Sequence, residues 1–116
     1  MRLAAVALMV PDWDAGIAFY VDELGFDLVE DRDEGRKRWV TVRAAANDPV
    51  LVLAVGSDPP RGRVAYFLET DDFARDAGRI EAAGGRFEEE PRIEAYGKVA
   101  VWRDPFGNRW DLIQRA

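Results

Sequence analysis

The sequence predicts an α+β fold built from two modules, each a strand, a helix and three further strands. Two observations support this. Asp12 and Asp72, which lie 60 positions apart, each follow an apolar segment and open a segment of helical periodicity. Between them, the glycine- and proline-rich segment 56–62 divides the chain near its middle. We therefore expect one domain with modules at 1–56 and 63–116 and a linker at 57–62.

In the first module, the spacing of apolar residues separates one helix from four strands. Asp12 is the expected N-cap, and Trp13 opens a run of apolar residues at helical spacing that ends at Gly25, a residue typical of helix ends. Strands are expected where β-branched and aromatic residues alternate or run on between turn residues. These strands cover 2–10, 26–30, 38–44 and 50–55.

The second module repeats this order. Residues 70–72 cap a helix whose Phe73, Ala77 and Ile80 face inward and which ends at Gly84-Gly85. A loop is expected at 91–97, and DPFGN at 104–108 is a tight turn because it is rich in residues that set turn geometry. The strands are expected at 64–69, 87–90, 98–103 and 109–114.

The composition excludes several classes of function. The net charge is −6, which argues against the basic face that nucleic acids or anionic lipids require. No apolar run approaches the ~18 residues of a membrane span. There is no cysteine, which fits a reducing cytoplasm, and we predict a cytoplasmic location. The absence of histidine excludes Ser-His-Asp and Cys-His catalysis.

Several short motifs match one known family. Phe19-Tyr20 and Leu24-Gly25-Phe26 are followed about 80 positions later by DPFGN at 104–108 and an alternating strand. With these segments, and with Val10-Pro11-Asp12, the whole chain resembles the vicinal oxygen chelate superfamily. That superfamily includes glyoxalase I, extradiol dioxygenases, and the fosfomycin and bleomycin resistance proteins. The resemblance implies paired βαβββ modules whose mixed sheets form a U-shaped cleft, and a homodimer.

Metal-dependent members of that superfamily bind a divalent ion through four side chains on four strands. By the resemblance, these positions fall on Ala5, Val52, Ala65 and Asp111. Three hydrocarbon side chains and one carboxylate cannot replace the hydration shell of a divalent ion. The resemblance therefore implies a member without metal or cofactor, such as the bleomycin resistance proteins, which bind a small molecule without changing it.

If those four positions face the cleft, the two-residue period of strands predicts its other lining residues. Trp102, with Ala100, is expected to face the cleft, and Trp110 to pack on the opposite face against a helix. Tyr96 lies either on a loop over the cleft or simply on the surface. The candidate ligand-binding residues are Trp39, Thr41, Arg43, Arg63, Phe67, Tyr96, Trp102, Arg109 and Asp111.

Asp111 has two interpretations. In an apolar cleft its carboxyl is expected to titrate high, and it would contact a cationic ligand. Alternatively, it forms an internal ion pair with Arg109, Arg63 or Arg43.

Three functions follow from these observations. The first is a metal-independent protein that sequesters an aromatic or cationic compound. The second is a lyase, isomerase or dioxygenase-like enzyme of the same superfamily. In it, Asp111 is the base and Tyr96 or an arginine the electrostatic partner. The third is a regulatory or structural subunit with a vestigial cleft.

Overall fold

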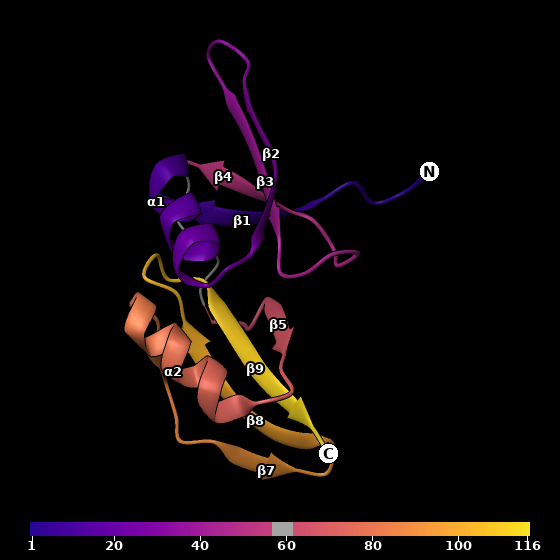
Figure 1. The fold of residues 1–116 in the computed structure, drawn as a ribbon, viewed down its shortest axis with the longest axis vertical. Coiled ribbons are helices and arrows are strands. Elements are labelled where there is room, and N and C mark those ends of the chain that lie inside the picture. Colours follow the sequence, from indigo (N-terminus) through magenta and orange to yellow (C-terminus); the bar gives the residue numbers. More distant parts are fainter. Residues whose placement is uncertain (57–61) are drawn as a thin grey trace. The chain divides into compact units, whose positions relative to one another are not determined.

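In the computed structural model, which describes residues 1–56 and 62–116, each half of the chain forms its own sheet and helix (Figure 1). We call the described residues before the gap unit 1 and those after it unit 2. Both sheets mix parallel and antiparallel pairs, so the predicted α+β fold is confirmed. The linker expected at 57–62 lies outside the described residues except for Gly62, and the U-shaped cleft stays a prediction.

Unit 1 is a four-stranded sheet with one helical segment. The strand order is β1-β4-β3-β2, in which β1 and β4 are parallel and the other neighbours antiparallel. The segment expected as a strand from residue 2 is paired only from Val6 onward. The elements are β1 (Val6–Val10), α1 (Trp13–Ile17), the π-helical η1 (Ala18–Glu23), β2 (Asp27–Asp33), β3 (Arg38–Arg43) and β4 (Leu51–Val55).

The helical segment of unit 1 begins and ends where the sequence predicts, but its second half is π-helical. The Asp12 side chain accepts a hydrogen bond from the Ala15 backbone N–H at 2.7 Å, which caps α1. Gly25, with φ +81°, follows the last turn. Gly16 lets α1 approach the sheet, because a Cβ atom there would lie 2.8 Å from the Leu53 side chain.

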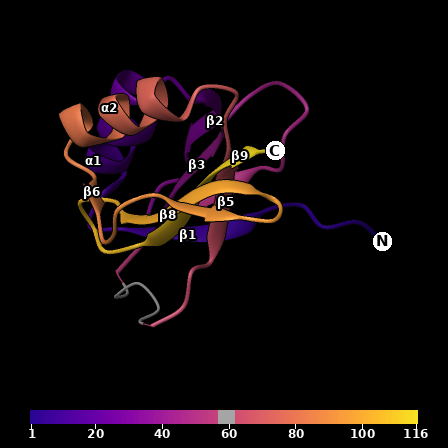
Figure 2. The same cartoon turned by 90° about the horizontal axis from the view of Figure 1, so that it is seen from below.

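Unit 2 has a similar plan with a longer helix. The path of the sheet is β5-β9-β8-β6, with β5 parallel to β9 and β7 paired to β8. Figures 1 and 2 both show α2 lying along one face of this sheet. The elements are β5 (Tyr66–Glu69), α2 (Phe73–Ala83), β6 (Arg86–Phe87), β7 (Arg92–Glu94), β8 (Gly97–Arg103) and β9 (Arg109–Arg115). The strand β7 was expected as a loop.

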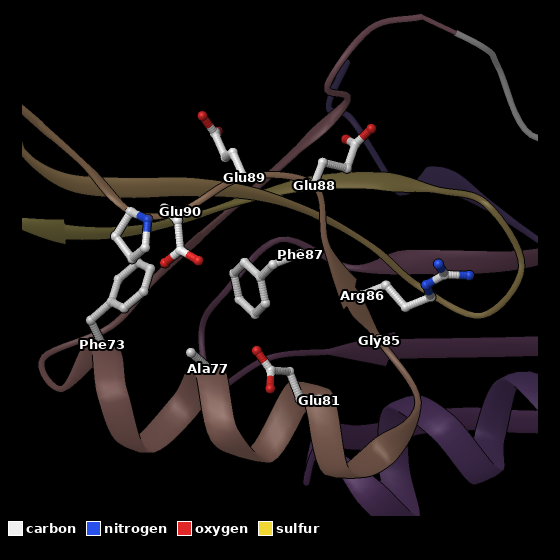
Figure 3. Close-up of a pocket in the computed structure, with 10 residues that line it drawn as sticks. Phe73, Ala77, Glu81, Gly85, Arg86, Phe87, Glu88, Glu89 and Glu90 are labelled. Atoms are coloured by element: carbon white, nitrogen blue, oxygen red, sulfur yellow. The ribbon is translucent and has the colours of Figure 1, made fainter.

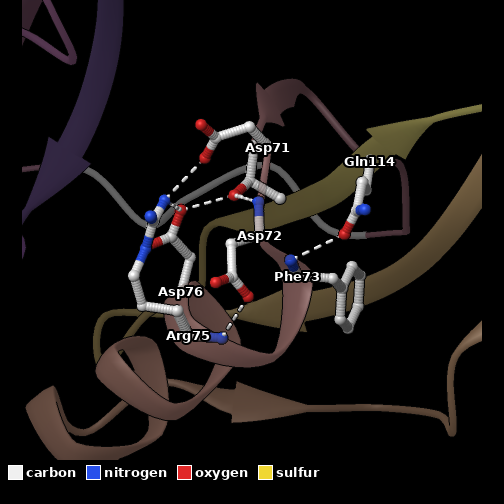
Figure 4. A network of polar contacts seen from close by, with 7 residues as sticks. Asp71, Asp72, Phe73, Arg75, Asp76 and Gln114 are labelled. Carbon is white, nitrogen blue, oxygen red and sulfur yellow. Dashed lines mark hydrogen bonds and ion pairs between the residues drawn. The ribbon is translucent and has the colours of Figure 1, made fainter.

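The N-terminus of α2 is fixed to the sheet by polar contacts (Figure 4). Asp72 is the N-cap, as predicted, and its side chain accepts from the Arg75 N–H at 3.1 Å. The Phe73 N–H donates to the Gln114 side chain on β9 at 2.7 Å. Arg75 also bonds Asp71 and Asp76. Two of the first helical N–H groups therefore have side-chain acceptors, one of them from the sheet.

The core of unit 2 is a stack of aromatic rings under α2. The Trp102 and Trp110 rings stack at 5.3 Å with an interplanar angle of 15°, and Tyr66 lies 4.9 Å from Trp110. Trp102 is fully buried and Trp110 nearly so. The turn between β8 and β9 is closed by buried Asp104, whose carboxylate accepts from the backbone N–H groups of Phe106 and Asn108. The tight turn predicted there is confirmed.

Among the described residues, no helix has the length and apolar character to cross a membrane.

Two glycines of unit 2 give opposite predictions for a change to alanine. Gly97 has φ +145°, and a Cβ atom there would lie 2.2 Å from the Gln114 carbonyl oxygen on β9. Backbone strain and the clash should lower the free energy of unfolding of Gly97→Ala by roughly 2–4 kcal/mol. Gly78 in α2 has no neighbouring atom within 4 Å of such a Cβ. Gly78→Ala should therefore be stabilising, by about 0.5–1 kcal/mol.

Urea denaturation of both variants and the wild type checks this pair of predictions. A Gly97→Ala variant as stable as the wild type would contradict the close approach of β8 and β9 at this position.

Candidate functional site

Each sheet has one face covered by its own helix and one face that this helix does not cover, which we call the helix-free face. In unit 1, Val10 and Leu53 contact the helix at Gly16. Because side chains alternate along a strand, the neighbours of these residues belong to the helix-free face. The register across β1, β4 and β3 places Ala7, Met9, Thr41, Val52 and Ala54 there.

The orientation predicted for Trp39, Thr41 and Arg43 agrees with this register, since alternation along β3 puts them on the face of Thr41. Thr41 is almost fully buried, whereas Trp39 is 36% exposed. Arg43 lies 3.8 Å from the Asp27 carboxylate and is partly buried. The role of these residues in ligand binding stays a prediction.

A β-bulge brings Glu30 to the same face. The pairing of β2 with β3 runs Leu28 to Val42 and then Glu30 to Thr41, so that Val29 is the extra residue. Without the bulge, alternation would turn Glu30 toward the helix. Its Oε1 atom instead accepts from Trp39 Nε1 at 3.1 Å and from Thr41 Oγ1 at 3.3 Å. The hydrogen bond from its ring N–H thus holds the Trp39 indole in place.

In unit 2, the helix-free face carries Phe67 and Asp111. The register aligns Phe67 on β5 with Asp111 on β9, and Asp111 with Val101 on β8. Phe67 is 64% exposed, an unusual value for a phenylalanine within a strand. The direct neighbours of Asp111 across the sheet are therefore apolar, and Glu69, which aligns with Ile113, is a second carboxylate further along the same face. By alternation, its remaining members include Val99, Arg109 and Ile113.

The orientation predicted for Trp102 and Ala100 is wrong. Trp102 pairs directly with Trp110 across β8 and β9, so both rings lie on the same face. A Cβ atom added at Gly85, just after α2, would lie 3.3 Å from the Trp102 ring, so this face is the one that α2 covers. Ala100, two residues earlier, lies there as well. Because α2 and the stack of rings fill this side, Trp102 is not part of the helix-free face.

The two other predicted residues of unit 2 lie at the surface. Arg63 is exposed and precedes β5 rather than lying within it. Tyr96 is 50% exposed in the turn between β7 and β8, which agrees with the surface interpretation.

Arg109 is paired to Glu88, a residue that no sequence pattern indicated as part of a site. Its Nε donates to Glu88 at 2.8 Å, and Arg103 Nε donates to the same carboxylate at 3.2 Å. Burial alone would raise the pKa of Glu88, but the two guanidinium groups outweigh it and lower the pKa. The ion pair that was the alternative for Asp111 is therefore not formed with Arg109.

Asp111 is left without a close counter-charge. Its Oδ1 atom is buried and has no hydrogen-bond partner among the described residues. Burial raises the pKa of this carboxyl above its ordinary value; the charges of Arg92 and Arg109 oppose the rise, and Glu89 adds to it. Arg92 itself is held by Glu89 and Glu94 at 2.7 Å each. The carboxylate can accept a hydrogen bond from a ligand.

The four metal-ligand positions implied by the resemblance offer one donor. Ala5 precedes β1, Val52 lies in β4, Ala65 precedes β5, and only Asp111 carries an oxygen. In the part of the chain that the structure describes, no group of three or more His, Cys, Asp or Glu side chains could hold a metal ion. The residues present therefore do not fit the divalent ion of the metal-dependent members.

Comparisons with known proteins agree on one family. A family model described as the glyoxalase/bleomycin resistance protein/dioxygenase superfamily matches residues 2–112. An uncharacterized protein of Shewanella frigidimarina is 45% identical over 121 residues, covering 94% of this chain and 90% of its own.

Two solved structures are similar over nearly the whole chain. UcmS2 has a TM-score of 0.80 and 29% identity, with 97% of each chain covered. TnmS3, described as an antibiotic binding protein from Streptomyces sp. CB03234, has a TM-score of 0.73 and 30% identity. That match covers 100% of this chain and 99% of TnmS3.

The isolated carboxylate predicts an unusual pH dependence. The pKa of Asp111 is higher in the folded chain than in the unfolded one, so this group destabilises the fold once pH exceeds its unfolded value of about 3.9. Asp111→Asn should therefore raise the free energy of unfolding at pH 7. The gain should vanish as pH falls below about 3.9, where the carboxyl is protonated in both states.

Urea denaturation between pH 3 and 7 measures this difference. Asp48→Asn, which removes an exposed acidic side chain in unit 1, is the matched control and should change stability by less than about 0.5 kcal/mol. A loss of stability in Asp111→Asn at pH 7 would show that the carboxylate has a stabilising partner.

The contact of Glu30 with the Trp39 indole gives a further prediction. Glu30→Ala removes the acceptor of two hydrogen bonds and should lower the free energy of unfolding by about 1 kcal/mol. Glu30→Gln keeps an acceptor oxygen and should lower it less. In NMR spectra, the indole N–H signal of Trp39, assigned with Trp39→Phe, should shift strongly only in Glu30→Ala. An unchanged signal would contradict the contact.

Proposed function

Since the chain belongs to the glyoxalase/bleomycin resistance protein/dioxygenase superfamily, we propose that it is a metal-independent protein that sequesters a small aromatic or cationic compound. TnmS3, at 30% identity, is described as an antibiotic binding protein, which supports a small-molecule ligand. The lack of donors at three of the four metal positions supports binding without a metal ion.

The observation that carries this proposal is the pairing of Phe67 with Asp111 on the helix-free face of unit 2. The exposed ring offers a flat apolar surface on which an aromatic group stacks. Beside it, the partly exposed carboxylate of Asp111, which has no ion-pair or hydrogen-bond partner among the described residues, accepts a hydrogen bond from an ammonium, guanidinium or amide N–H. A cation placed there offsets the cost of holding a carboxylate in apolar surroundings.

Trp39 is a second candidate platform, on unit 1. Its indole N–H is already satisfied by Glu30, so binding through the ring face leaves no buried polar group unpaired. The hydrogen bond also restricts the ring before the ligand arrives, which lowers the entropy lost on binding. We propose that Thr41 acts indirectly, because it is buried and its hydroxyl donates to the same carboxylate.

We also propose that the protein is a homodimer. β1 stands at one edge in the strand order of its sheet. Leu3 and Val6, at and before this edge, are exposed apolar side chains. The cytoplasmic location and the lack of nucleic-acid and membrane partners stay predictions that rest on the acidic, cysteine-free composition.

An enzyme is the second candidate, because burial raises the pKa of Asp111 toward the range of a general base. In a lyase or isomerase of this kind, the carboxylate would take a proton from a carbon acid. No arginine among the described residues pairs with Asp111, and Tyr96 lies in an exposed turn. The set of groups needed to stabilise an anionic intermediate is therefore incomplete, which favours binding.

A ligand screen tests the two candidates together. We expect cationic glycopeptide or planar aromatic antibiotics to raise the melting temperature of the protein. The bound compound should be recovered with its mass unchanged. Asp111→Asn and Phe67→Ala should each weaken binding about tenfold, which corresponds to about 1.4 kcal/mol, whereas Asp48→Asn should not.

Other outcomes of the screen would contradict the proposal. Conversion of the compound, lost in Asp111→Asn, would favour the enzyme. Stoichiometric bound metal in the purified protein, measured by mass spectrometry, would overturn metal independence.

A further inference from the structure

We propose that unit 2 carries a second binding site, which takes a small organic cation with an aromatic or alkyl body. The site is a groove of about 700 Å³ between α2 and the segment that leaves β6 (Figure 3). This size lies within the range of small-molecule sites, ~300–1,000 Å³. The lining residues are Phe73, Ala77, Glu81, Gly85, Arg86, Phe87, Glu88, Glu89, Glu90 and Pro91.

The middle of the groove is apolar. The Phe73 ring at the start of α2 and the Phe87 ring of β6 lie with centroids 6.2 Å apart at an angle of 48°. Ala77, one turn into the helix, and Pro91 complete this surface. The Phe73 ring is almost fully buried, so the accessible apolar surface of the groove is the partly exposed Phe87 ring with Ala77 and Pro91. The groove can therefore accept a flat or branched apolar group.

Two carboxylates without partners flank this apolar surface. In Figure 3, the carboxylates of Glu81 on α2 and Glu90 point toward the Phe87 ring from two sides. Neither residue has an ion pair or side-chain hydrogen bond within the part of the chain that the structure describes. Glu88 and Glu89, by contrast, point away from the ring and are held by arginines. The acidic run at 88–90 therefore has one member that faces the groove.

The charges of the groove select the sign of its ligand. The Arg86 guanidinium points away from the ring in Figure 3, so the groove presents two negative charges to a molecule lying on Phe87. An anion would be repelled, and a neutral apolar molecule would gain no electrostatic attraction from either carboxylate. A cation with an apolar body satisfies both features, because its charge meets Glu81 and Glu90 while its body covers the Phe87 ring.

A contact within unit 2 illustrates the attraction of a cation to an aromatic ring of this groove. The Nζ atom of Lys98 on β8 lies 4.9 Å from the centroid of the Phe73 ring, a cation–π contact. No side-chain cation among the described residues lies over Phe87, the ring between the two carboxylates. The ligand cation would therefore take at Phe87 the place that Lys98 takes at Phe73. This site is separate from the helix-free face and does not depend on the function proposed above.

NMR titration with benzyltrimethylammonium tests the proposal, with benzyl alcohol as the neutral aromatic control. We expect backbone amide shifts confined to residues 73–91, saturating at millimolar concentrations, and at least tenfold weaker binding of benzyl alcohol. The double variant Glu81→Gln/Glu90→Gln should weaken binding of the cation at least tenfold. Asp22→Asn/Asp48→Asn, which removes the same charge from unit 1, should leave binding unchanged.

Phe87→Leu is the second probe, because it keeps the groove apolar but removes the ring. It should weaken the binding of the cation more than the binding of benzyl alcohol. This difference distinguishes a cation–π contact from simple apolar packing. The proposal is overturned if no shifts appear in 73–91 up to the solubility limit. It is equally overturned if the Glu81/Glu90 variant and the unit 1 control bind the cation equally well.

Discussion

The stack of Trp102 on Trp110 decides what each face of the second sheet can do. These two rings lie on directly paired residues of β8 and β9, and together with Tyr66 they fill the side that α2 covers. Since side chains alternate along a strand, the residue after Trp110 has to point the other way. Asp111 is that residue, and its partners across the sheet are Phe67 and Val101. Packing energy on one face thereby holds a carboxylate among apolar groups on the other.

The arginines near Asp111 pair with other acidic residues, which leaves Asp111 without an ion-pair partner. Glu88 takes both Arg103 and Arg109, and Arg92 is shared by Glu89 and Glu94. Arg92 and Arg109, whose charges act on Asp111, are thus each ion-paired with glutamates. The pKa values move accordingly, down for Glu88 and up for Asp111. The same arrangement leaves Glu90, one residue after this paired set, free to face the groove under α2.

The sequence was sufficient where a local signal determines the structure. The caps at Asp12 and Asp72 are set by side chains that bond backbone N–H groups within three residues, and the 104–108 turn by one buried aspartate. Features that depend on pairing between distant residues were not predictable. The face of Trp102 follows from its register with Trp110, and the orientation of Glu30 from a bulge at Val29. Neither the pairing register nor the bulge produces a hydrophobic pattern that can be recognised within one strand. The strand β7 is too short to show such a pattern.

The chain has the fold of the superfamily, but three of the four positions that correspond to the metal ligands carry no donor atom. The side chains at those positions indicate which functions remain available. Hydrocarbon at positions 5, 52 and 65 leaves those positions without donor atoms for a metal ion, and on unit 2 the helix-free face presents the exposed Phe67 ring beside the Asp111 carboxylate. Catalysis needs groups that stabilise a developing charge, and the nearby arginines are already neutralised. Binding needs only complementarity to a ground state. In the function that we propose, the Asp111 carboxylate beside Phe67 meets that lesser requirement for a cationic or N–H-bearing aromatic molecule.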